Sequence, residues 1–339
     1  MTRPSWAKLD GAIAQTLETI LPFLPIALSP LCSEPEQSDA LGINSSNFRL
    51  NTPQGGFLLK RWSHQANISD IKITLSIMTW LATRRVPAPA PVPFRNGEVL
   101  LRLESSSWSL FPFIEGNYFS GEGDELIATA EATGHLMQFL AQLPAMHMPS
   151  NGPAHMTAAD GALLLQIHAN PQSWDQWFGM EDASSLAKCW PMVLAEWENL
   201  SQSPLKDGLT QAAHFDLHPH NLIVNHQAVV AVLDFEACKL MPVGYALAFA
   251  ALKQCRQAMT RQASTGDPRA TGNMYLRAAV NHYTHARDIA TQFGDLAICE
   301  VLRRICIILR LNVESSERKW NKVLPIQLGH LREARALFG

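Results

Sequence analysis

Features that mark several common classes of protein are missing from this 339-residue chain. Its six cysteines are scattered without a C-x-x-C pair, which argues against a zinc site and against a dense disulfide framework. No stretch reaches the ~18 apolar residues that a transmembrane helix needs. The net charge of −3 supplies no broad basic surface for nucleic acid. We therefore expect a cytoplasmic protein without membrane or nucleic-acid partners.

The chain does contain enough apolar residues for a large core. At 47% hydrophobic, it can form one large or two modest domains. The apolar stretch over residues 19–32 has a signal-peptide character, but Pro22, Pro25 and Pro30 interrupt it. Apolar residues at helical spacing instead predict an amphipathic helix over residues 5–21.

The most informative stretch runs from His214 to Glu236. Two apolar runs there flank the polar tripeptide at 225–227, which predicts a β-hairpin. Asp216 and Asn221 precede the first run, and Asp234 follows the second. Because a hairpin folds its two ends side by side, these oxygen-bearing side chains are expected to converge. Carboxylate and amide oxygens suit magnesium, so the pattern predicts a magnesium and phosphate site.

This pattern, H-x-D-x-x-x-x-N followed by an aspartate at a strand end, resembles the aminoglycoside phosphotransferase and choline kinase-like small-molecule kinases. Their loop commonly reads HGDLHPGN and their metal aspartate lies in V-I-D-F-E; the strings here are HFDLHPHN and VLDFE. The resemblance implies an α+β, two-lobe protein kinase-like fold with ATP in the cleft. A helical extension over 1–40 would precede a small antiparallel-sheet N-lobe over 41–113. The mostly helical C-lobe would cover 114–339 and carry the catalytic hairpin, 214–236.

The same resemblance implies a role for each motif residue. Asp216 would accept the proton of the substrate hydroxyl, as a general base. Asn221 and Asp234 would hold Mg²⁺.

Three further residues of the stretch are expected to support this site. His214 would brace the loop by hydrogen bonds, and His218 matches the histidine common in the family. Glu236 is a candidate for contacting a second metal ion or for capping the next segment.

Alternating apolar residues on either side of a glycine turn predict a strand pair ending in Lys60. Alternation places Lys60 on the face of Leu58 and Trp62, so its ammonium group is expected to reach the α and β phosphates of ATP. Ser46 and Asn47 stand where the resembling family often carries a serine and an asparagine. A turn there would offer hydroxyl and backbone N–H groups to phosphate.

Two more strands are expected over 98–103 and 108–113. The string from Phe111 to Gly116 resembles the hinge that holds adenine through one backbone carbonyl and one backbone N–H. Proline cannot donate, so Pro112 would supply the carbonyl and Ile114 the N–H. An edge strand that merely contains a proline is an equal alternative.

The sequence departs from the family's pattern in three places. The helix expected over 68–85 lacks the glutamate that pairs with the strand lysine, since Thr74 and Ser76 are uncharged. Either Asp70 or another element would replace it, or catalysis is slow or absent. His220 replaces a glycine, which puts the loop geometry in doubt, and Ala246 replaces an aspartate.

Residues from 126 onward are expected to be mainly helical, over 126–143, 161–167, 183–200, 280–290 and 296–311. The first of these helices are acidic, which would favour a cationic acceptor such as an amine or aminosugar. The basic C-terminal helices could face an anionic substrate, a partner or these acidic helices, and the last is expected. An aminoglycoside, another amino alcohol, a sugar or homoserine would each need only a hydroxyl near Asp216, so the acceptor stays open.

Two other functions remain in view. His214, Asp216, His218 and His220 form H-x-D-x-H-x-H, which could bind zinc or iron in a metallohydrolase. Alternatively, the departures from the pattern favour a non-catalytic nucleotide-binding relative.

Overall fold

The computed structural model describes residues 5–8, 11–38, 45–103, 105–122, 124–152, 156–178, 183–202, 205, 208–261, 266–314 and 323–339. The chain forms two compact units. The sheet unit holds residues 1–120, 143–150 and 220–238, and the helical unit holds 121–142, 151–219 and 239–339. The expected domain boundary at residues 40 and 41 lies outside the described residues. None of the helices described could span a bilayer.

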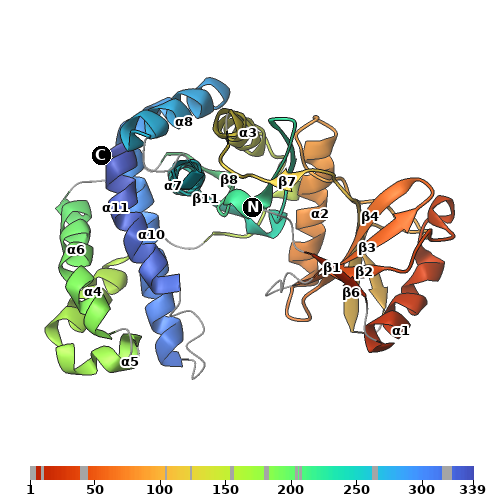
Figure 1. Cartoon of the computed structure of the whole chain (residues 1–339), viewed down its shortest axis with the longest axis horizontal. Helices are drawn as coiled ribbons and strands as arrows, with labels where there is room; N and C mark the ends of the chain where they lie inside the picture. Colours follow the sequence, from red (N-terminus) through yellow and green to blue (C-terminus); the bar gives the residue numbers. More distant parts are fainter. Residues whose placement is uncertain are drawn as a thin grey trace. The chain divides into compact units, whose positions relative to one another are not determined.

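The sheet unit is built on a six-stranded sheet with the order β1-β2-β3-β4-β6-β5, in which all paired neighbours are antiparallel (Figure 1). Its strands are β1 (Trp6–Lys8), β2 (Glu36–Ser38), β3 (Ser45–Thr52), β4 (Gly55–Trp62), β5 (Leu101–Leu103) and β6 (Ser106–Pro112). Helix α2 (Ile68–Ala82) begins at Asn67, whose side chain accepts from the Ser69 N–H. The small-sheet N-lobe was predicted correctly.

Helix α1 (Gly11–Ile20) packs on one face of this sheet. Its Leu17 and Ile20 join a buried cluster with Phe48 and Trp108 of the strands. Burial of such side chains, at about 1.5–3 kcal/mol each, fixes the N-terminal segment on the sheet. The helix predicted over 5–21 was wrong at its start. Trp6–Lys8 is an edge strand paired with Glu36–Ser38, a long-range contact that helical spacing cannot reveal.

The predicted hairpin is present within a second sheet of order β10-β9-β7. Strands β9 (Leu222–Asn225) and β10 (Ala228–Val232) pair antiparallel, and β7 (Asn117–Tyr118) pairs with β9. Because Asn225 pairs with Ala228, the turn is the dipeptide His226-Gln227, and both residues have positive φ, 48° and 63°. Such left-handed pairs match the twist of a two-residue hairpin.

The helical unit contains a short two-stranded sheet, β8 (Thr210–His214) with β11 (Cys238–Pro242). Its helices are α3 (Glu125–Leu140), α4 (Ala158–Ala169), α5 (Trp174–Phe178), α6 (Ala183–Gln202), α7 (Val243–Arg261), α8 (Pro268–His282), α9 (Ala286–Ile289), α10 (Phe293–Glu314) and α11 (Leu324–Phe338). The helix expected over 280–290 is interrupted between α8 and α9. In Figure 1, α10 and α11 run side by side, and α7 also packs against α10.

Candidate functional site

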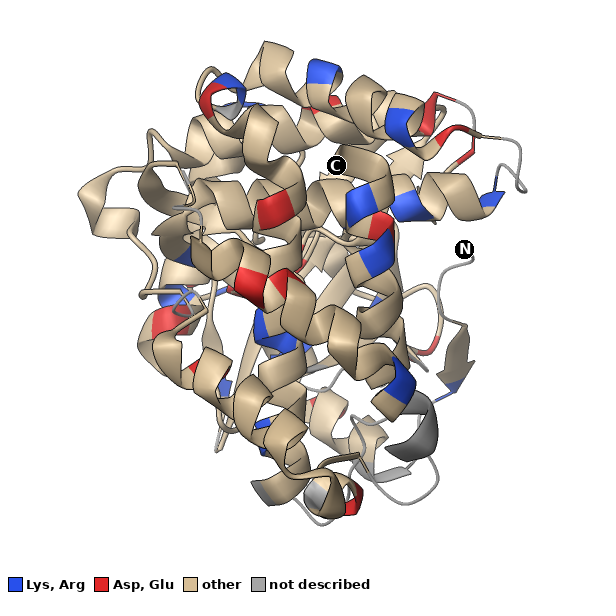
Figure 2. Cartoon of the chain, turned by 90° about the vertical axis from the view of Figure 1, so that its left-hand side faces the viewer, with Lys and Arg blue, Asp and Glu red and all other residues tan. Residues whose placement is uncertain are grey.

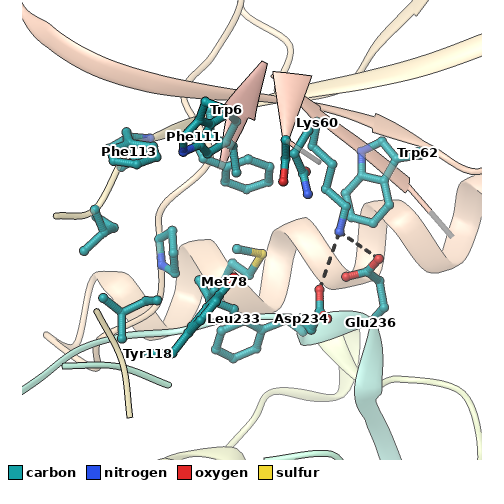
Figure 3. Close-up of a pocket in the computed structure, with 18 residues that line it drawn as sticks. Trp6, Lys60, Trp62, Met78, Phe111, Phe113, Tyr118, Leu233, Asp234 and Glu236 are labelled. Carbon is teal, nitrogen blue, oxygen red and sulfur yellow. Dashed lines mark hydrogen bonds and ion pairs between the residues drawn. The ribbon is translucent and has the colours of Figure 1, made fainter. Parts of the chain in front are cut away.

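A cavity of about 170 Å³ opens within the sheet unit, lined by strands of the main sheet, by α2 and by the hairpin (Figure 3). One water needs about 10–15 Å³ on this measure, so the cavity has room for an organic group. Its walls are mainly apolar and aromatic, and its polar groups lie near Lys60. The aromatic lining residues are Trp6, Trp62, Phe111, Phe113, Tyr118 and Phe235. An apolar pocket with a few convergent polar groups is the usual form of a small-molecule site.

Lys60 lies in this cavity with Leu58 and Trp62, as strand alternation predicted. It is 8% exposed, and its Nζ lies 4.3 Å from the centroid of the Trp62 ring. The Nζ donates to Glu236 Oε1 at 2.8 Å and lies 3.9 Å from Asp234 Oδ1 (Figure 3). Both carboxylates follow β10, so the chain after the hairpin supplies the partners of the strand lysine.

Glu236 therefore forms the ion pair with Lys60 that was expected from a helix glutamate. Thr74 of α2 is buried, and the Ser76 hydroxyl donates to the Ile73 carbonyl of its own helix. Helix α2 instead contacts η6 (Phe235–Ala237), the one-turn helix that contains Glu236. Sequence reasoning anticipated a substitute from another element but did not identify it, because the pair joins residues 176 positions apart.

Asn47 is the direct cross-strand partner of Lys60 in the β3–β4 pair, and it also lines the cavity. Its Oδ1 is buried and accepts no hydrogen bond among the described residues. A buried acceptor of this kind is costly unless a ligand or water satisfies it. Ser46 is not among the lining residues; its hydroxyl accepts from Arg61 Nη2 at 3.4 Å.

The hinge candidates Pro112 and Ile114 both line the cavity. Between them, the Phe113 N–H is already used, since it donates to the Gly56 carbonyl at 2.9 Å. Gly116 follows at φ 142°, and a Cβ there would lie 2.7 Å from the Val224 carbonyl oxygen. Only glycine permits that approach, so it fixes the path by which the chain leaves the hinge segment.

Asn221 and Asp234 lie at the same end of the hairpin. The Leu233 N–H donates to the Asn221 carbonyl at 2.8 Å, which sets Asn221 beside the residue that precedes Asp234. Asp234 has a left-handed backbone, φ 57° and ψ 49°, a conformation that aspartate and asparagine tolerate better than most residues. Strained backbone of this kind is frequent at functional sites.

His220 does not need the flexibility of the glycine it replaces. It lies in the one-turn helix η5 (Pro219–Asn221) and is not one of the described residues with positive φ. Its ring packs edge-to-face on Tyr118 at 5.4 Å between centroids. The loop geometry that the sequence left in doubt is therefore compatible with histidine.

Asp216 belongs to the helical unit, so its convergence with Asn221 and Asp234 stays a prediction. His214 is fully buried, and its Nδ1 accepts from the Asp216 N–H at 3.3 Å. His218 Nε2 lies 3.7 Å from Asp216 Oδ2, and Arg304 Nη2 lies 3.3 Å from Asp216 Oδ1. The carboxylate is about one-third exposed, at 32%. Sequence reasoning missed Arg304 as a neighbour of Asp216.

The basic C-terminal helices pair with acidic residues of their own unit, as predicted. Arg310 contacts Asp160 at 2.6 Å, and Arg335 contacts Glu196 at 2.7 Å. Hydrogen bonds from Thr157 and Arg310 outweigh the effect of burial and lower the pKa of Asp160. Figure 2 shows basic (blue) and acidic (red) residues interspersed along the helices. Because these acids are neutralised, less acidic surface remains to attract a cationic acceptor.

The metallohydrolase alternative requires a cluster of metal-binding side chains. No group of three or more His, Cys, Asp or Glu side chains among the described residues is arranged to hold a metal ion. In particular, His214 is buried and its Nδ1 is engaged by the loop backbone. The six cysteines are free thiols, four of them buried, and none belongs to such a group among the described residues.

Solved structures of low sequence identity share the fold. A spectinomycin phosphotransferase in complex with ADP and spectinomycin matches with a TM-score of 0.65 and 12% identity, over 96% of this chain and 97% of that chain. A microcompartment-associated aminopropanol kinase matches with a TM-score of 0.59 and 15% identity, over 96% and 95%. The α+β two-lobe kinase-like fold is thereby confirmed.

Homoserine kinases are among the sequence relatives of this chain. The protein from Xanthobacter autotrophicus is 26% identical over 202 residues, 58% of this chain and 57% of the relative. The protein from Bradyrhizobium diazoefficiens is 36% identical over 77 residues, 23% of this chain and 24% of the relative. The longer match spans little more than half of the relative. The model of the phosphotransferase enzyme family matches residues 37–287, and the chain belongs to this family.

Proposed function

We propose that the protein is an ATP- and magnesium-dependent kinase that transfers the γ-phosphate to a hydroxyl of a small molecule. The observation that carries this proposal is the Lys60 ammonium group, held between Glu236 and Asp234 at an aromatic-walled cavity. A buried cation beside carboxylates and an apolar pocket suits a nucleotide, whose phosphates need positive charge and whose base needs an apolar slot.

The residues of the cavity fit the parts of a nucleotide. Lys60 would contact the phosphates, and Asn47 has a buried oxygen that a ligand donor would satisfy. Ser46 is kept as a weaker candidate because its side chain is engaged by Arg61. The Pro112 carbonyl and the Ile114 N–H would hold the adenine, as expected for a hinge.

Asn221 and Asp234 would hold Mg²⁺ through their side-chain oxygens, which are the ligand type that this ion prefers. When bound, the ion would offset the negative charge of the phosphate oxygens. Glu236 would position Lys60, rather than serve only as a cap, because its 2.8 Å ion pair is the shortest contact of that ammonium group.

Asp216 would accept the hydroxyl proton of the acceptor. The hydroxyl oxygen of the acceptor would then attack the γ-phosphorus, and the bond from that phosphorus to the oxygen bridging to the β-phosphate would break, with ADP as the leaving group. His214 and His218 would hold the loop that presents it. The relatives are named homoserine kinases, and the structural neighbours are named a spectinomycin phosphotransferase and an aminopropanol kinase, so a small hydroxyl compound as acceptor is consistent with all of these names.

The test has two stages. First, thermal unfolding is measured with ATP, with and without Mg²⁺; a ligand at ~100 times its Kd stabilises by about 2.7 kcal/mol. Second, ADP release is measured over a panel of hydroxyl compounds. Nucleotide binding without ADP release from any acceptor would favour the non-catalytic alternative. Absence of nucleotide binding would reject the proposal.

A further inference from the structure

One face of helix α7 carries a row of residues beside Asp216. Phe249, Lys253 and Arg256 follow one another at intervals of four and three, so they share this face. Arg304 of α10 stacks on the Phe249 ring, with its Cζ 3.8 Å from the centroid, and Lys253 Nζ lies 5.7 Å from the same centroid. The two cations therefore flank a single aromatic ring next to the proposed general base.

Only some of the hydrogen-bond donors of Arg304 are engaged by other described residues. Its Nε donates to Glu300 Oε1 at 2.8 Å, and its Nη2 donates to Asp216 Oδ1 at 3.3 Å. No hydrogen bond to another described residue is formed by its Nη1, although the side chain is 22% exposed. A guanidinium presents a rigid fork of donors, so the remaining nitrogen stays available to an anion.

Lys253 has no carboxylate partner within ion-pair distance in the described part of the chain. It is half-buried, and burial lowers the pKa of its ammonium group to about 8. Arg304 and Arg256 lower this pKa as well, while Asp216 and Glu333 raise it. Lys253 therefore interacts electrostatically with Asp216 and with the charged residues around it.

The surrounding charges do not cancel. Glu300 forms ion pairs with Arg303 and Arg304, and Glu333 forms an ion pair with Arg256. Burial lowers the pKa of the nearby His330 to about 3, which keeps it neutral. The cluster has four cations, on Lys253, Arg256, Arg303 and Arg304. It has three carboxylates, on Asp216, Glu300 and Glu333, so one positive charge is left over.

We propose that Lys253 and Arg304 bind the carboxylate of the acceptor, so that the substrate is a short hydroxy acid of the homoserine class. This inference rests on the proposed function and names its acceptor. One carboxylate would neutralise the excess charge and accept from both the ammonium group and Arg304 Nη1. Because Arg304 also contacts Asp216, the hydroxyl and the carboxylate of the acceptor must lie only a few bonds apart.

The same arrangement disfavours a polycationic acceptor. Aminosugar antibiotics carry several ammonium groups, which would meet a cluster that is already positive, and like charges repel strongly where water is partly excluded. The expectation of a cationic acceptor, drawn from the acidic helices, is replaced by this proposal.

The experiment compares four acceptors with ATP and Mg²⁺: L-homoserine, 4-hydroxybutanoate, 3-aminopropan-1-ol and kanamycin. L-homoserine and 4-hydroxybutanoate carry a carboxylate. 3-Aminopropan-1-ol has the structure of homoserine without its carboxylate. We expect kcat/KM for homoserine to exceed that for 3-aminopropan-1-ol by about 10- to 100-fold, the effect of one charge-assisted hydrogen bond. Equal or better use of 3-aminopropan-1-ol or kanamycin would overturn the proposal.

The variant Lys253→Met keeps the apolar stem and removes the charge. We expect it to lower the ratio of kcat/KM for homoserine over 3-aminopropan-1-ol by about tenfold or more. The matched control is Lys188→Met, at an exposed lysine of α6, which should keep the wild-type ratio. Thermal unfolding of both variants verifies that they are folded, and Lys253→Gln replaces Lys253→Met if that protein does not fold. An unchanged ratio in the folded variant contradicts the role of Lys253.

Failure of this inference and failure of the proposed function give different results. If ADP appears with every acceptor alike, the kinase proposal stands and the carboxylate site is wrong. If neither these four acceptors nor the wider panel of hydroxyl compounds yields ADP, the kinase proposal fails, and 4-hydroxybutanoate binding is then measured by calorimetry. Binding to the wild type but not to Lys253→Met supports the anion site, and absence of binding rejects it.

Discussion

The two units contain polar clusters of opposite net charge. In the sheet unit, Lys60 stands between Asp234 and Glu236, which leaves one negative charge. In the helical unit, the arginines and Lys253 around Asp216 leave one positive charge. The first cluster suits a divalent cation beside phosphates, and the second suits an organic anion. The comparison suggests that each unit recognises a different partner of the same reaction.

The largest effect is expected from Asp216→Asn. Loss of a general base costs about 10²- to 10⁴-fold in kcat, whereas nucleotide binding in the sheet unit should hardly change. Initial rates of ADP release and ATP titration by calorimetry measure the two properties. Asp175→Asn, at an exposed aspartate of α5, is the matched control. Unchanged turnover in Asp216→Asn would remove this residue as the base.

The second largest effect is expected from Asp234→Asn, in the Lys60 cluster of the sheet unit. Asparagine tolerates the left-handed backbone, so this change tests the charge of the side chain and not the backbone conformation. We expect the apparent affinity for Mg²⁺ in the presence of ATP to fall by roughly 100-fold. The measurement is ATP-induced thermal stabilisation over a series of Mg²⁺ concentrations. Equal stabilisation of variant and wild type would contradict the metal role.

A smaller effect is expected from Glu236→Gln. The amide can still accept from Lys60, but it no longer holds the ammonium group by charge, so the KM for ATP should rise by roughly 5- to 10-fold. Glu98→Gln, at an exposed residue of the same unit, serves as control. If neither Glu236→Gln nor Glu236→Ala changes the KM for ATP, Glu236 has no part in positioning Lys60.

An effect of comparable size is expected from pH. The Lys253 charge is present below its pKa of about 8 and lost above it, so the KM for homoserine should rise by up to about tenfold between about pH 7 and pH 9. The charged groups facing Lys253 are Asp216, Arg256, Arg304 and Glu333, and the titratable His330, which is neutral over this pH range, also faces it. Lys253→Met should lack this rise.

Titration of Lys253 does not destabilise the fold over this pH range. The unfolded lysine has the higher pKa, 10.5, and so binds its proton more tightly than the folded one. The contribution of Lys253 to stability therefore increases as pH rises from about 8 to 10.5. A profile that is the same in wild type and Lys253→Met would assign the pH effect to another group.

Local patterns predicted much of the fold and of the sheet-unit site. The hairpin followed from two apolar runs around polar residues, and the inward orientation of Lys60 followed from strand alternation. Both depend on residues close together in sequence, whose pattern directly reflects burial. The predicted phosphate, metal and base roles of the motif residues remain to be tested.

Contacts between distant segments could not be predicted in this way. Trp6 lines the cavity because its strand pairs with β2, but a single N-terminal tryptophan carries no such signal. Glu236 pairs with Lys60 across the fold, and Arg304 reaches Asp216 from a helix 88 positions later. For Lys253, a signal did exist: its spacing from Phe249 and Arg256 marks a common helix face.

The turn of the hairpin offers a means of stabilising the protein. His226 and Gln227 are both held in a conformation that costs most side chains roughly 1–2 kcal/mol. The double change His226→Asn and Gln227→Gly would install the dipeptide that such turns favour and relieve that strain. Neither residue lines the cavity, so a more heat-resistant scaffold for ligand-bound crystallography could be obtained without altering the chemistry.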